Sequence, residues 1–272
     1  NRNYVVIYPN NDLGSSLILK EYEKIKNRVE QKTGVKFQVE YSYQNPKTDT
    51  IAVNSDNELF KTGEGKLFFR PGGHGALIDN LNDLTADLVF VKNIDNVVVQ
   101  SEAEEVAKYK RILGGKLLKL QQECFRFLKE MDSAEPSAEL NGEIVDFLQT
   151  NFFLGLKKDF LQLSEEEKQN YLKEKLNRPL RVCGMVKNEG EPGGGPFLIT
   201  EENGENSLQI IESAQIDQNN PQQNEIAQNA THFNPVDIVC GLKDYKGETF
   251  DLHKFVDPST SFVAEKTKEG KP

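Results

Sequence analysis

Hydrophobic and polar residues follow two different rhythms in the first part of the chain. Tyr4–Tyr8 is a short β-branched and aromatic run, which favours a buried strand. Apolar residues then recur at helical spacing from Leu19 to Val29, and Gly34 ends the pattern as a glycine commonly ends a helix. Lys36–Ser42 alternates apolar and polar residues and predicts a second strand. A strand, a helix and a strand in this order are typical of a parallel α/β unit.

The middle of the chain continues with one strand pattern and three helical ones. The apolar run Leu88–Val91 predicts a buried strand. Helical periodicity then covers Glu102–Met131, where Gly114 and the glycine after it favour a break or a bend. Shorter helices are expected at Ile144–Phe153 and after Ser164, whose capping box with the glutamate three residues later marks a helix start.

The last third of the chain has shorter patterns. Strands are expected at Arg181–Val186 and Ser207–Glu212, and Ile238–Cys240 fits a short strand or a turn of helix. Gln218–Gln228 is rich in Asn and Gln and predicts an exposed connection.

Together these elements predict an α/β fold: a mostly parallel, Rossmann-like sheet with helices on both faces. Continuous apolar runs fit this arrangement, because helices bury both faces of a parallel sheet. Neither an internal repeat nor a firm linker interrupts the pattern, so residues 1–272 are expected to form a single domain.

The composition excludes some classes of partner. The chain of 272 residues has a net charge of -10 and a pI near 5.0, which argues against a nucleic-acid surface, because duplex binding depends on Lys and Arg. The apolar runs are too short to cross a bilayer and no signal peptide is recognisable, so we expect a cytoplasmic protein with no membrane partner. Cys124, Cys183 and Cys240 lack metal-type spacing and are expected to be free thiols.

A glycine-rich turn, Pro-Gly-Gly-His-Gly, lies within Phe69–Leu77. Gly72, Gly73 and Gly75 allow positive φ angles and can expose consecutive N–H groups, which form a nest for an anion or for the edge of a base. The turn also fits a tight connection between a strand and a helix, with His74 exposed. The strand end that follows it favours the ligand site.

That strand end carries Asn93-Ile94-Asp95-Asn96 directly after an apolar run. In open α/β sheets, ligands bind beyond the carboxyl ends of the strands. Burying Asp95 alone would be costly, so it needs a cation or several hydrogen-bond donors. Mg²⁺ shared with nucleotide phosphates meets this need, because Mg²⁺ takes one or two carboxylates together with phosphate oxygens. The alternative is that Asp95 or Asn96 caps the segment that follows.

These two motifs resemble the uridine-binding loop and the metal-binding strand end of the UDP-sugar pyrophosphorylases, which carry Pro-Pro-Gly-His-Gly and Asn-Ile-Asp-Asn at a similar separation. The chain is more similar still to a bacterial family known as domain of unknown function 4301. The segments that match its signatures are Phe69–Leu77, Asn80–Asn82, Lys92–Val97 and Thr231–Asp237. The resemblance covers most of the chain and implies a nucleotidyltransferase core of glycosyltransferase-A type.

The resemblance also implies roles for particular residues in nucleotide binding. The glycine-rich turn would contact the uracil and lie near the phosphates through Gly72, Gly73, His74 and Gly75. Asp95 would hold Mg²⁺, with Asn93 as an orienting group. Phe262–Thr267 is similar to the Phe-x-Pro-Val-Lys-Thr of the pyrophosphorylases, although it departs from that pattern at Ala264 and Glu265, and Lys266 would then reach the transferring phosphate.

Sugar-binding residues are implied in the same way. Glu212 ends a Leu-Gln-Ile-Ile-Glu run, as a glutamate does in the sugar-contacting segment of the UDP-N-acetylhexosamine pyrophosphorylases. Thr231-His232-Phe233-Asn234 stands where those enzymes have Asn-His-Phe. Thr231 replaces their sugar-binding asparagine, so Glu212, Thr231 and Asn234 are candidate sugar ligands without a transferable sugar specificity.

The implied activity joins UTP and a sugar 1-phosphate into a UDP-sugar and releases pyrophosphate, with Asp95 and Lys266 as catalytic residues and Mg²⁺ as cofactor. The pyrophosphorylases begin with a glycine-rich loop of Leu-x-x-Gly-x-Gly-Thr type. No such loop precedes Tyr4, so the chain is expected to be the central and C-terminal part of a longer protein. The alternatives are a nucleotide- or nucleotide-sugar-binding protein without turnover and a purely structural α/β domain. Serine-nucleophile, zinc and Gly-x-Gly-x-x-Gly patterns are not found.

Overall fold

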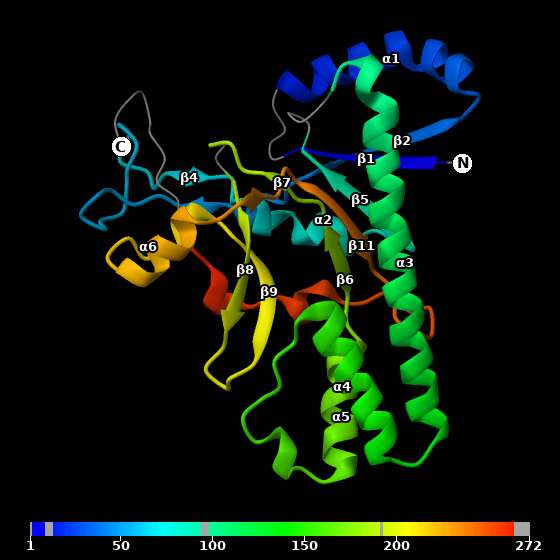
Figure 1. Ribbon diagram of the computed structural model, residues 1–272. Helices are drawn as coiled ribbons and strands as arrows, with labels where there is room; N and C mark the ends of the chain where they lie inside the picture. The colour runs from blue at the N-terminus through cyan, green and yellow to red at the C-terminus, as the bar shows by residue number, and fades with distance from the viewer. Residues whose placement is uncertain (1, 9–12, 94–97, 191–192, 264–272) are drawn as a thin grey trace. The chain divides into compact units, whose positions relative to one another are not determined.

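The computed structural model describes residues 2–8, 13–93, 98–190 and 193–263 (Figure 1). The described residues divide into two compact units. Unit 1 holds those of 2–84 together with Asp251–Lys254, and unit 2 holds those of 85–250 and 255–263. The assignment of residues 1–272 to one domain stays a prediction.

Unit 1 opens with the expected strand, helix and strand. Strand β1 (Arg2–Tyr8) leads to helix α1 (Leu13–Thr33), and β2 (Phe37–Tyr43) follows. The two strands pair in parallel from Arg2 opposite Phe37 to Tyr8 opposite Tyr43, which confirms the predicted parallel unit. Gly34 ends the helix with a φ of 66°, a left-handed conformation that glycine adopts without strain.

Short elements complete unit 1. A 3₁₀ turn at Pro46–Thr48 precedes β3 (Thr50–Ile51), which pairs antiparallel with β4 (Phe69–Arg70). The predicted helix behind the glycine-rich turn is present as a 3₁₀ turn, His74–Leu77, that runs directly into α2 (Ile78–Asn82).

The sheet of unit 2 has the strand order β5–β11–β6, and both of its pairings are antiparallel. Its strands are β5 (Leu88–Lys92), β11 (Asp237–Gly241) and β6 (Leu180–Cys183). The predicted mix of helices and strands is therefore confirmed, but the prediction of a mostly parallel, Rossmann-like sheet is wrong for the described residues. A buried apolar run looks the same whether its strand pairs parallel or antiparallel, so the sequence pattern did not indicate that these strands pair antiparallel.

Three helices supply the main core of unit 2, and their side chains pack into one cluster. They are α3 (Ala103–Ser133), α4 (Ala138–Phe152) and α5 (Glu165–Leu176). Leu128, Ile144 and Leu172, one from each helix, are fully buried in that cluster. Helix α3 also packs against β11 and β6, so it joins the helical core to the sheet.

The predicted break in α3 does not occur, because the helix runs without interruption through both glycines. Gly114 is buried, and a Cβ at this position would lie 3.0 Å from the ring of Phe90 on β5. The glycine therefore allows the helix to approach the sheet closely. No helix among the described residues has an apolar stretch long enough to cross a membrane.

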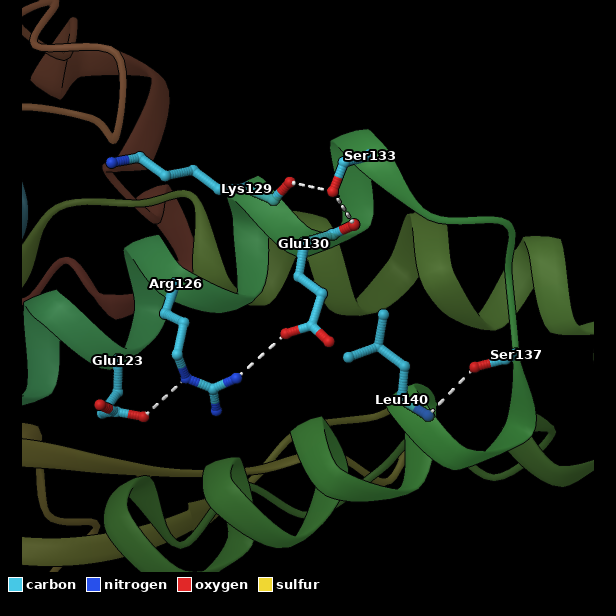
Figure 2. A network of polar contacts seen from close by, with 7 residues as sticks. All are labelled: Glu123, Arg126, Lys129, Glu130, Ser133, Ser137 and Leu140. Carbon is cyan, nitrogen blue, oxygen red and sulfur yellow. Dashed lines mark hydrogen bonds and ion pairs between the residues drawn. The ribbon is translucent and has the colours of Figure 1, made fainter.

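Polar contacts define the junction between α3 and α4 (Figure 2). Arg126 pairs along the helix surface with Glu123 at 3.1 Å and with Glu130 at 3.0 Å. The hydroxyl of Ser133 donates to backbone carbonyls of the last turn, and Ser137 caps α4 by accepting from the N–H of Leu140 at 3.2 Å. Exposed ion pairs on a helix, such as those of Arg126, contribute only about 0.3–0.5 kcal/mol each. The two serines fix where the helices end.

The remaining elements of unit 2 are short strands and one short helix. They are β7 (Val186–Lys187) paired with β10 (His232–Phe233), the hairpin of β8 (Gly195–Thr200) and β9 (Asn206–Ile211), and α6 (Pro221–Gln228). Gln218–Gln228 is mostly exposed, as predicted, but the helix within it was not predicted. Asn220 caps this helix by accepting from two backbone N–H groups, and Pro221 fits its first turn.

The β8–β9 turn is tied to α5 by a buried carboxylate. Glu205 is 6% exposed; its Oε1 accepts from the hydroxyl of Tyr171 at 2.6 Å, and its Oε2 pairs with Lys175 at 2.7 Å. Burial alone would raise the pKa of Glu205, but the hydrogen bonds from Lys175 and Tyr171 hold it below its ordinary value. Burial, and then the bond to Glu205, raise the pKa of Tyr171.

Replacing Glu205 with glutamine should lower the free energy of unfolding by about 3 kcal/mol at pH 7, because Lys175 would stay partly buried without its counter-charge. Because the pKa of Glu205 is lowered on folding, the ionised carboxylate stabilises the fold above its ordinary pKa. The difference between the two proteins should therefore shrink as the pH falls through the lowered value. Urea unfolding across this pH range measures it.

The matched control is Glu202→Gln, which changes an exposed glutamate of the same turn. It should alter the unfolding free energy by no more than about 0.5 kcal/mol. Equal effects of the two substitutions would contradict the role given to Glu205.

Candidate functional site

The glycine-rich turn of unit 1 lies between β4 and α2 (Figure 1). A Cβ at Gly72 would sit 2.8 Å from the backbone oxygen of Thr48, so only glycine fits there without displacing backbone. Gly73 and Gly75 face open space, and His74 is exposed. The turn therefore combines one position of close packing with backbone that a ligand can approach.

The predicted nest of positive φ angles is not formed. Among the described residues, the glycines with positive φ are Gly34, Gly65, Gly190, Gly204 and Gly247, none of which belongs to this turn. The residue before the 3₁₀ turn, Gly73, is extended, with φ -69° and ψ -170°. The sequence at this turn is explained by close approach and by the absence of side chains, and not by left-handed backbone.

A buried amide lies beside the turn. Gln44 is 6% exposed, and its Nε2 lies 3.4 Å from the Cβ position of Gly72. The hydroxyl of Thr48 donates to the carbonyl of Asn45 at 2.7 Å, so it can only accept from Gln44 Nε2, at 3.0 Å. This fixes the amide orientation and leaves Gln44 Oε1 buried with no donor among the described residues. Such an unpaired acceptor costs about 1–3 kcal/mol, which a donor on a ligand would offset.

Asn80, on α2, repeats this arrangement. It is 6% exposed, and its Nδ2 donates to the hydroxyl of Ser42 at 2.5 Å and to the carbonyl of Tyr43 at 2.9 Å. Its Oδ1 has no donor in the part of the chain that the structure describes. We did not assign a ligand role to Gln44 or Asn80 from the sequence. The signal that could have found Asn80 was its place in Asn80–Asn82, a segment already singled out for its resemblance.

Residues from late in the chain hold α2 in unit 1. His253 Nε2 lies 2.7 Å from Oδ1 of Asp79, and its Nδ1 lies 3.1 Å from Oδ1 of Asp251. The N–H of Leu252 donates to Oδ1 of Asn82 at 2.7 Å. The bonds to Asp79 and then Asp251 raise the pKa of His253, which has a structural role here.

In unit 2, several polar residues gather at one end of the sheet. Lys92 pairs with Asp237 in register, so Asn93 leaves β5 where the chain enters β11. Gly184, just after β6, donates its N–H to the carbonyl of Asp237 at 2.7 Å. Asp95, the predicted metal ligand, and Lys266 lie outside the described residues.

Asn234 fixes this end of the sheet. It is 6% exposed, its Nδ2 donates to the carbonyl of Gly184 at 2.6 Å, and its Oδ1 accepts from the N–H of Val236 at 3.0 Å. Its own N–H donates to the carbonyl of Gly194 at 2.9 Å. Its amide thus positions the backbone through bonds on both sides, and its contact with a sugar stays a prediction.

Glu212 meets the same glycine from another segment. A Cβ at Gly194 would lie 2.9 Å from Glu212 Oε1 and 2.4 Å from Cγ2 of Ile210, so the site requires glycine. Glu212 also caps the 3₁₀ turn Ser213–Gln215: its side chain accepts from the backbone of Gln215, whose Oε1 accepts from the N–H of Glu212 at 2.9 Å. The carboxylate therefore has a structural partner in addition to its predicted role with a sugar.

Thr231 lines a hollow of about 300 Å³ within unit 2. The hollow is lined by Met185, Pro196, Phe197, Asn229, Ala230, Thr231 and His232. Thr231 Oγ1 and His232 Nδ1 are 2.8 Å apart, which orients the imidazole ring. Small polar groups beside an aromatic and a proline ring form a surface of mixed polarity, which suits a ligand that carries both hydroxyl groups and apolar faces.

The predicted sugar residues are thus brought together in part. Asn234 bonds the carbonyl of Gly194, a Cβ at that glycine would lie 2.9 Å from Glu212 Oε1, and Thr231 lies three residues before Asn234, on the wall of the hollow. The sequence interpretation did not single out the cationic pair at the same sheet end. Lys92 and Lys110 both bind the carboxylate of Asp237. Two of these three belong to matched motif segments, but nothing in the sequence placed Lys110 beside them.

No group of three or more His, Cys, Asp or Glu side chains arranged to hold a metal ion occurs within the described ranges. The three cysteines are free, as expected. Burial raises the pKa of Cys124 to about 12 and that of Cys240 to about 11, so neither is a ready thiolate.

Comparison with known proteins gives a family. Residues 12–272 match the domain of unknown function DUF4301, so the chain belongs to that family. No curated protein matches the chain, and no solved structure matches it.

Asp79→Asn should lower the pKa of His253, because it removes the hydrogen bond that raises it most. Asp251→Asn should lower it less, and Asp83→Asn, an exposed change beside α2, should leave it unchanged. NMR titration of the His253 ring protons gives the three midpoints. Because the folded pKa is raised, this contact stabilises unit 1 fully below pH 6.5 and is lost as the pH rises through the raised value. An unchanged midpoint in Asp79→Asn would contradict the assignment.

Proposed function

From the resemblance of its motifs to those of the UDP-sugar pyrophosphorylases, we propose that this chain is a nucleotidyltransferase-like protein that handles a sugar phosphate and a uridine nucleotide. The parent reaction is that of a UTP:sugar-1-phosphate uridylyltransferase. The hollow beside β10 is proposed as a sugar site of unit 2, and the glycine-rich turn is proposed as a base site of unit 1, each considered by itself.

One observation carries the proposal. Three residues that sequence resemblance marked as sugar ligands come from two segments of the chain. Asn234 donates its N–H to the carbonyl of Gly194, a Cβ at that glycine would lie 2.9 Å from Glu212 Oε1, and Thr231 borders the adjoining hollow. The volume of about 300 Å³ is at the lower end of the range for small-molecule sites. Met185 and Phe197 offer apolar contact for a sugar face, and the Thr231 hydroxyl offers a hydrogen bond.

The glycine-rich turn supports the nucleotide half of the proposal. Gly73 and Gly75 leave open space for a planar ring against the backbone, and Gln44 Oε1 is an acceptor without a donor among the described residues. Uracil carries one ring N–H donor, the complement of that acceptor. His74 is exposed, and the resemblance assigns it to the phosphates. An orphan acceptor gives selectivity, because a ligand without the donor would leave it unpaired.

Uridylyl transfer is an in-line displacement that needs no protein nucleophile, so positioning and charge are the contributions of the protein. A Mg²⁺ ion would neutralise phosphate charge when bound, and one carboxylate such as Asp95 suffices for it because phosphate oxygens complete its coordination. Asp95 and Lys266 are proposed for these roles from resemblance alone. Asn93, at the end of β5, would orient the same segment.

Calorimetric titration tests the nucleotide half. UTP should bind, and more tightly with Mg²⁺. Gln44→Leu should weaken binding about tenfold, because a charge-free hydrogen bond and its desolvation amount to roughly 1.4 kcal/mol. Gln38→Leu changes an exposed amide on β2 and serves as the control. Equal affinity of Gln44→Leu and the wild type for UTP would show that the base does not bind at this turn.

The sugar half is tested with UDP-glucose and the isosteric substitution Thr231→Val. Affinity should fall several-fold, because one hydroxyl and the ring orientation of His232 are lost. Thr249→Val, an exposed threonine elsewhere in unit 2, should bind as the wild type does. If Thr231→Val binds UDP-glucose unchanged, the hollow is not the sugar site.

Release of pyrophosphate from UTP and glucose 1-phosphate separates an enzyme from a binder. Binding with turnover supports the transferase. Binding of UTP and UDP-glucose without turnover supports the alternative, a non-catalytic nucleotide-sugar-binding protein, and binding of neither ligand leaves a structural α/β domain.

A further inference from the structure

Two lysines from different elements share one carboxylate at the end of the unit 2 sheet. Lys92 Nζ, from β5, lies 3.1 Å from Oδ2 of Asp237, and Lys110 Nζ, from α3, lies 2.6 Å from Oδ1. Asp237 begins β11 and pairs with Lys92 in strand register. The register and the packing of α3 therefore hold both ammonium groups within the span of a single carboxylate.

This cluster carries more positive charge than it neutralises. The side chains of Lys92, Lys110 and Asp237 are 27%, 28% and 20% exposed, so all three are largely removed from water yet reachable. Asp237 is the single ion-pair partner of each lysine among the described residues, and each ammonium has three donors. Counting the described residues alone, the cluster has one net positive charge and N–H donors beyond the two that bind Asp237. It is partly desolvated, and charge interactions are stronger there than in bulk water.

Among the described residues, no second acidic side chain pairs with either lysine. The α3 residues one turn from Lys110, on the same stripe of the helix, are all apolar or glycine: Val106, Ala107, Leu113 and Gly114. On the sheet, the residue two positions before Lys92 on the same face is Phe90. A purely structural ion pair needs one lysine, so the second one is unexplained by the fold.

The cluster lies next to the proposed sugar site. Gly184 bonds the carbonyl of Asp237 and also accepts from Asn234, and Met185, the next residue, lines the hollow. A Cβ at Gly184 would lie 3.2 Å from that carbonyl and 3.2 Å from Leu113 of α3, so the close approach depends on glycine. One short connection after β6 thus links the lysine pair to the hollow.

We infer that Lys92 and Lys110 form a binding site for a phosphate monoester dianion, held in place by Asp237. The inference rests on the proposed function in taking the ligand to be a sugar phosphate, whose sugar occupies the hollow. Lysine ammonium groups bind phosphate as point charges. Asp237 acts as a positioning residue: it draws the two ammonium groups together and leaves one positive charge for the ligand.

The test is calorimetric titration of the full chain with inorganic phosphate, then with glucose 1-phosphate and with glucose, at low and moderate salt. Wild type should bind phosphate at one site, and more weakly as the salt concentration rises. Lys92→Met and Lys110→Met should each weaken phosphate binding about tenfold, since a hydrogen bond to a charged group is lost. Lys119→Met removes the same charge from an exposed position of α3 and should change nothing.

Asp237→Asn separates this site from a structural ion pair. It raises the net charge of the cluster, so it should tighten phosphate binding several-fold even as it lowers the melting temperature, and phosphate should restore more of that temperature than in wild type. A structural pair predicts only the loss of stability. This variant also decides the matter if a lysine variant fails to fold.

Absence of saturable phosphate binding in wild type, or equal binding by the lysine variants, would overturn the inference. If glucose 1-phosphate binds equally well to wild type and to the lysine variants, the proposal of a sugar site in the hollow stands and the proposal of the lysine site is rejected. If phosphate binds through the lysines but glucose 1-phosphate binds no more tightly than phosphate, the lysine site is retained and the sugar proposal fails.

Discussion

The pairing register of β11 is the constraint on which unit 2 depends. This strand is paired on both sides, with Val239 fully buried between Phe90 and Val182. The register sets Asp237 opposite Lys92 and places the N–H of Gly184 on its carbonyl. A slip by one residue would turn every side chain of the strand to the other face. It would also separate the carboxylate from both lysines, so the geometry of the site and the burial of the core are set together.

Close approach, more than unusual backbone, accounts for the glycines at the two candidate sites. Gly72 lies against a backbone carbonyl in unit 1, and Gly194 lies against Ile210 and Glu212 in unit 2. At both, a Cβ would meet another atom at less than 3.0 Å. Where polar side chains are buried next to these glycines, as Gln44 and Asn234 are, they bond to backbone or to a neighbouring hydroxyl. Local structure and ligand chemistry thus use the same few residues.

Much of the local structure could be predicted from the sequence, because its causes are local. The helical spacing of α1, its glycine end and the capping box of Ser164 with Glu167 all depend on neighbours within a few residues. The antiparallel insertion of β11 could not be predicted. It pairs residues that lie far apart in the sequence, such as Lys92 and Asp237. An apolar run alone does not indicate whether its strand pairs parallel or antiparallel. Helix α6 was not predicted because most of its residues are polar, although the cap Asn220 followed by Pro221 marks a helix start.

The ligand roles that resemblance assigned to site residues stay predictions. Motif resemblance pointed to Gly72, Glu212 and Asn234. In the structure Gly72 packs closely against backbone, Glu212 caps a 3₁₀ turn, and the side chain of Asn234 bonds to backbone. It did not find Lys110, whose role depends on α3 lying across the sheet. Charge that is brought together by tertiary packing leaves no trace in local sequence.

The central claim is that the end of β5, the connection after β6 and the start of β11 form one site for a sugar phosphate. Hydrogen exchange with and without glucose 1-phosphate tests it most directly. The ligand should slow exchange in residues 183–187 and 230–237, while residues 138–176 of the helical core exchange as before, because tightly packed helices away from the ligand gain no contacts. Unchanged exchange in both segments at saturating ligand, or protection confined to the helical core, would contradict the account.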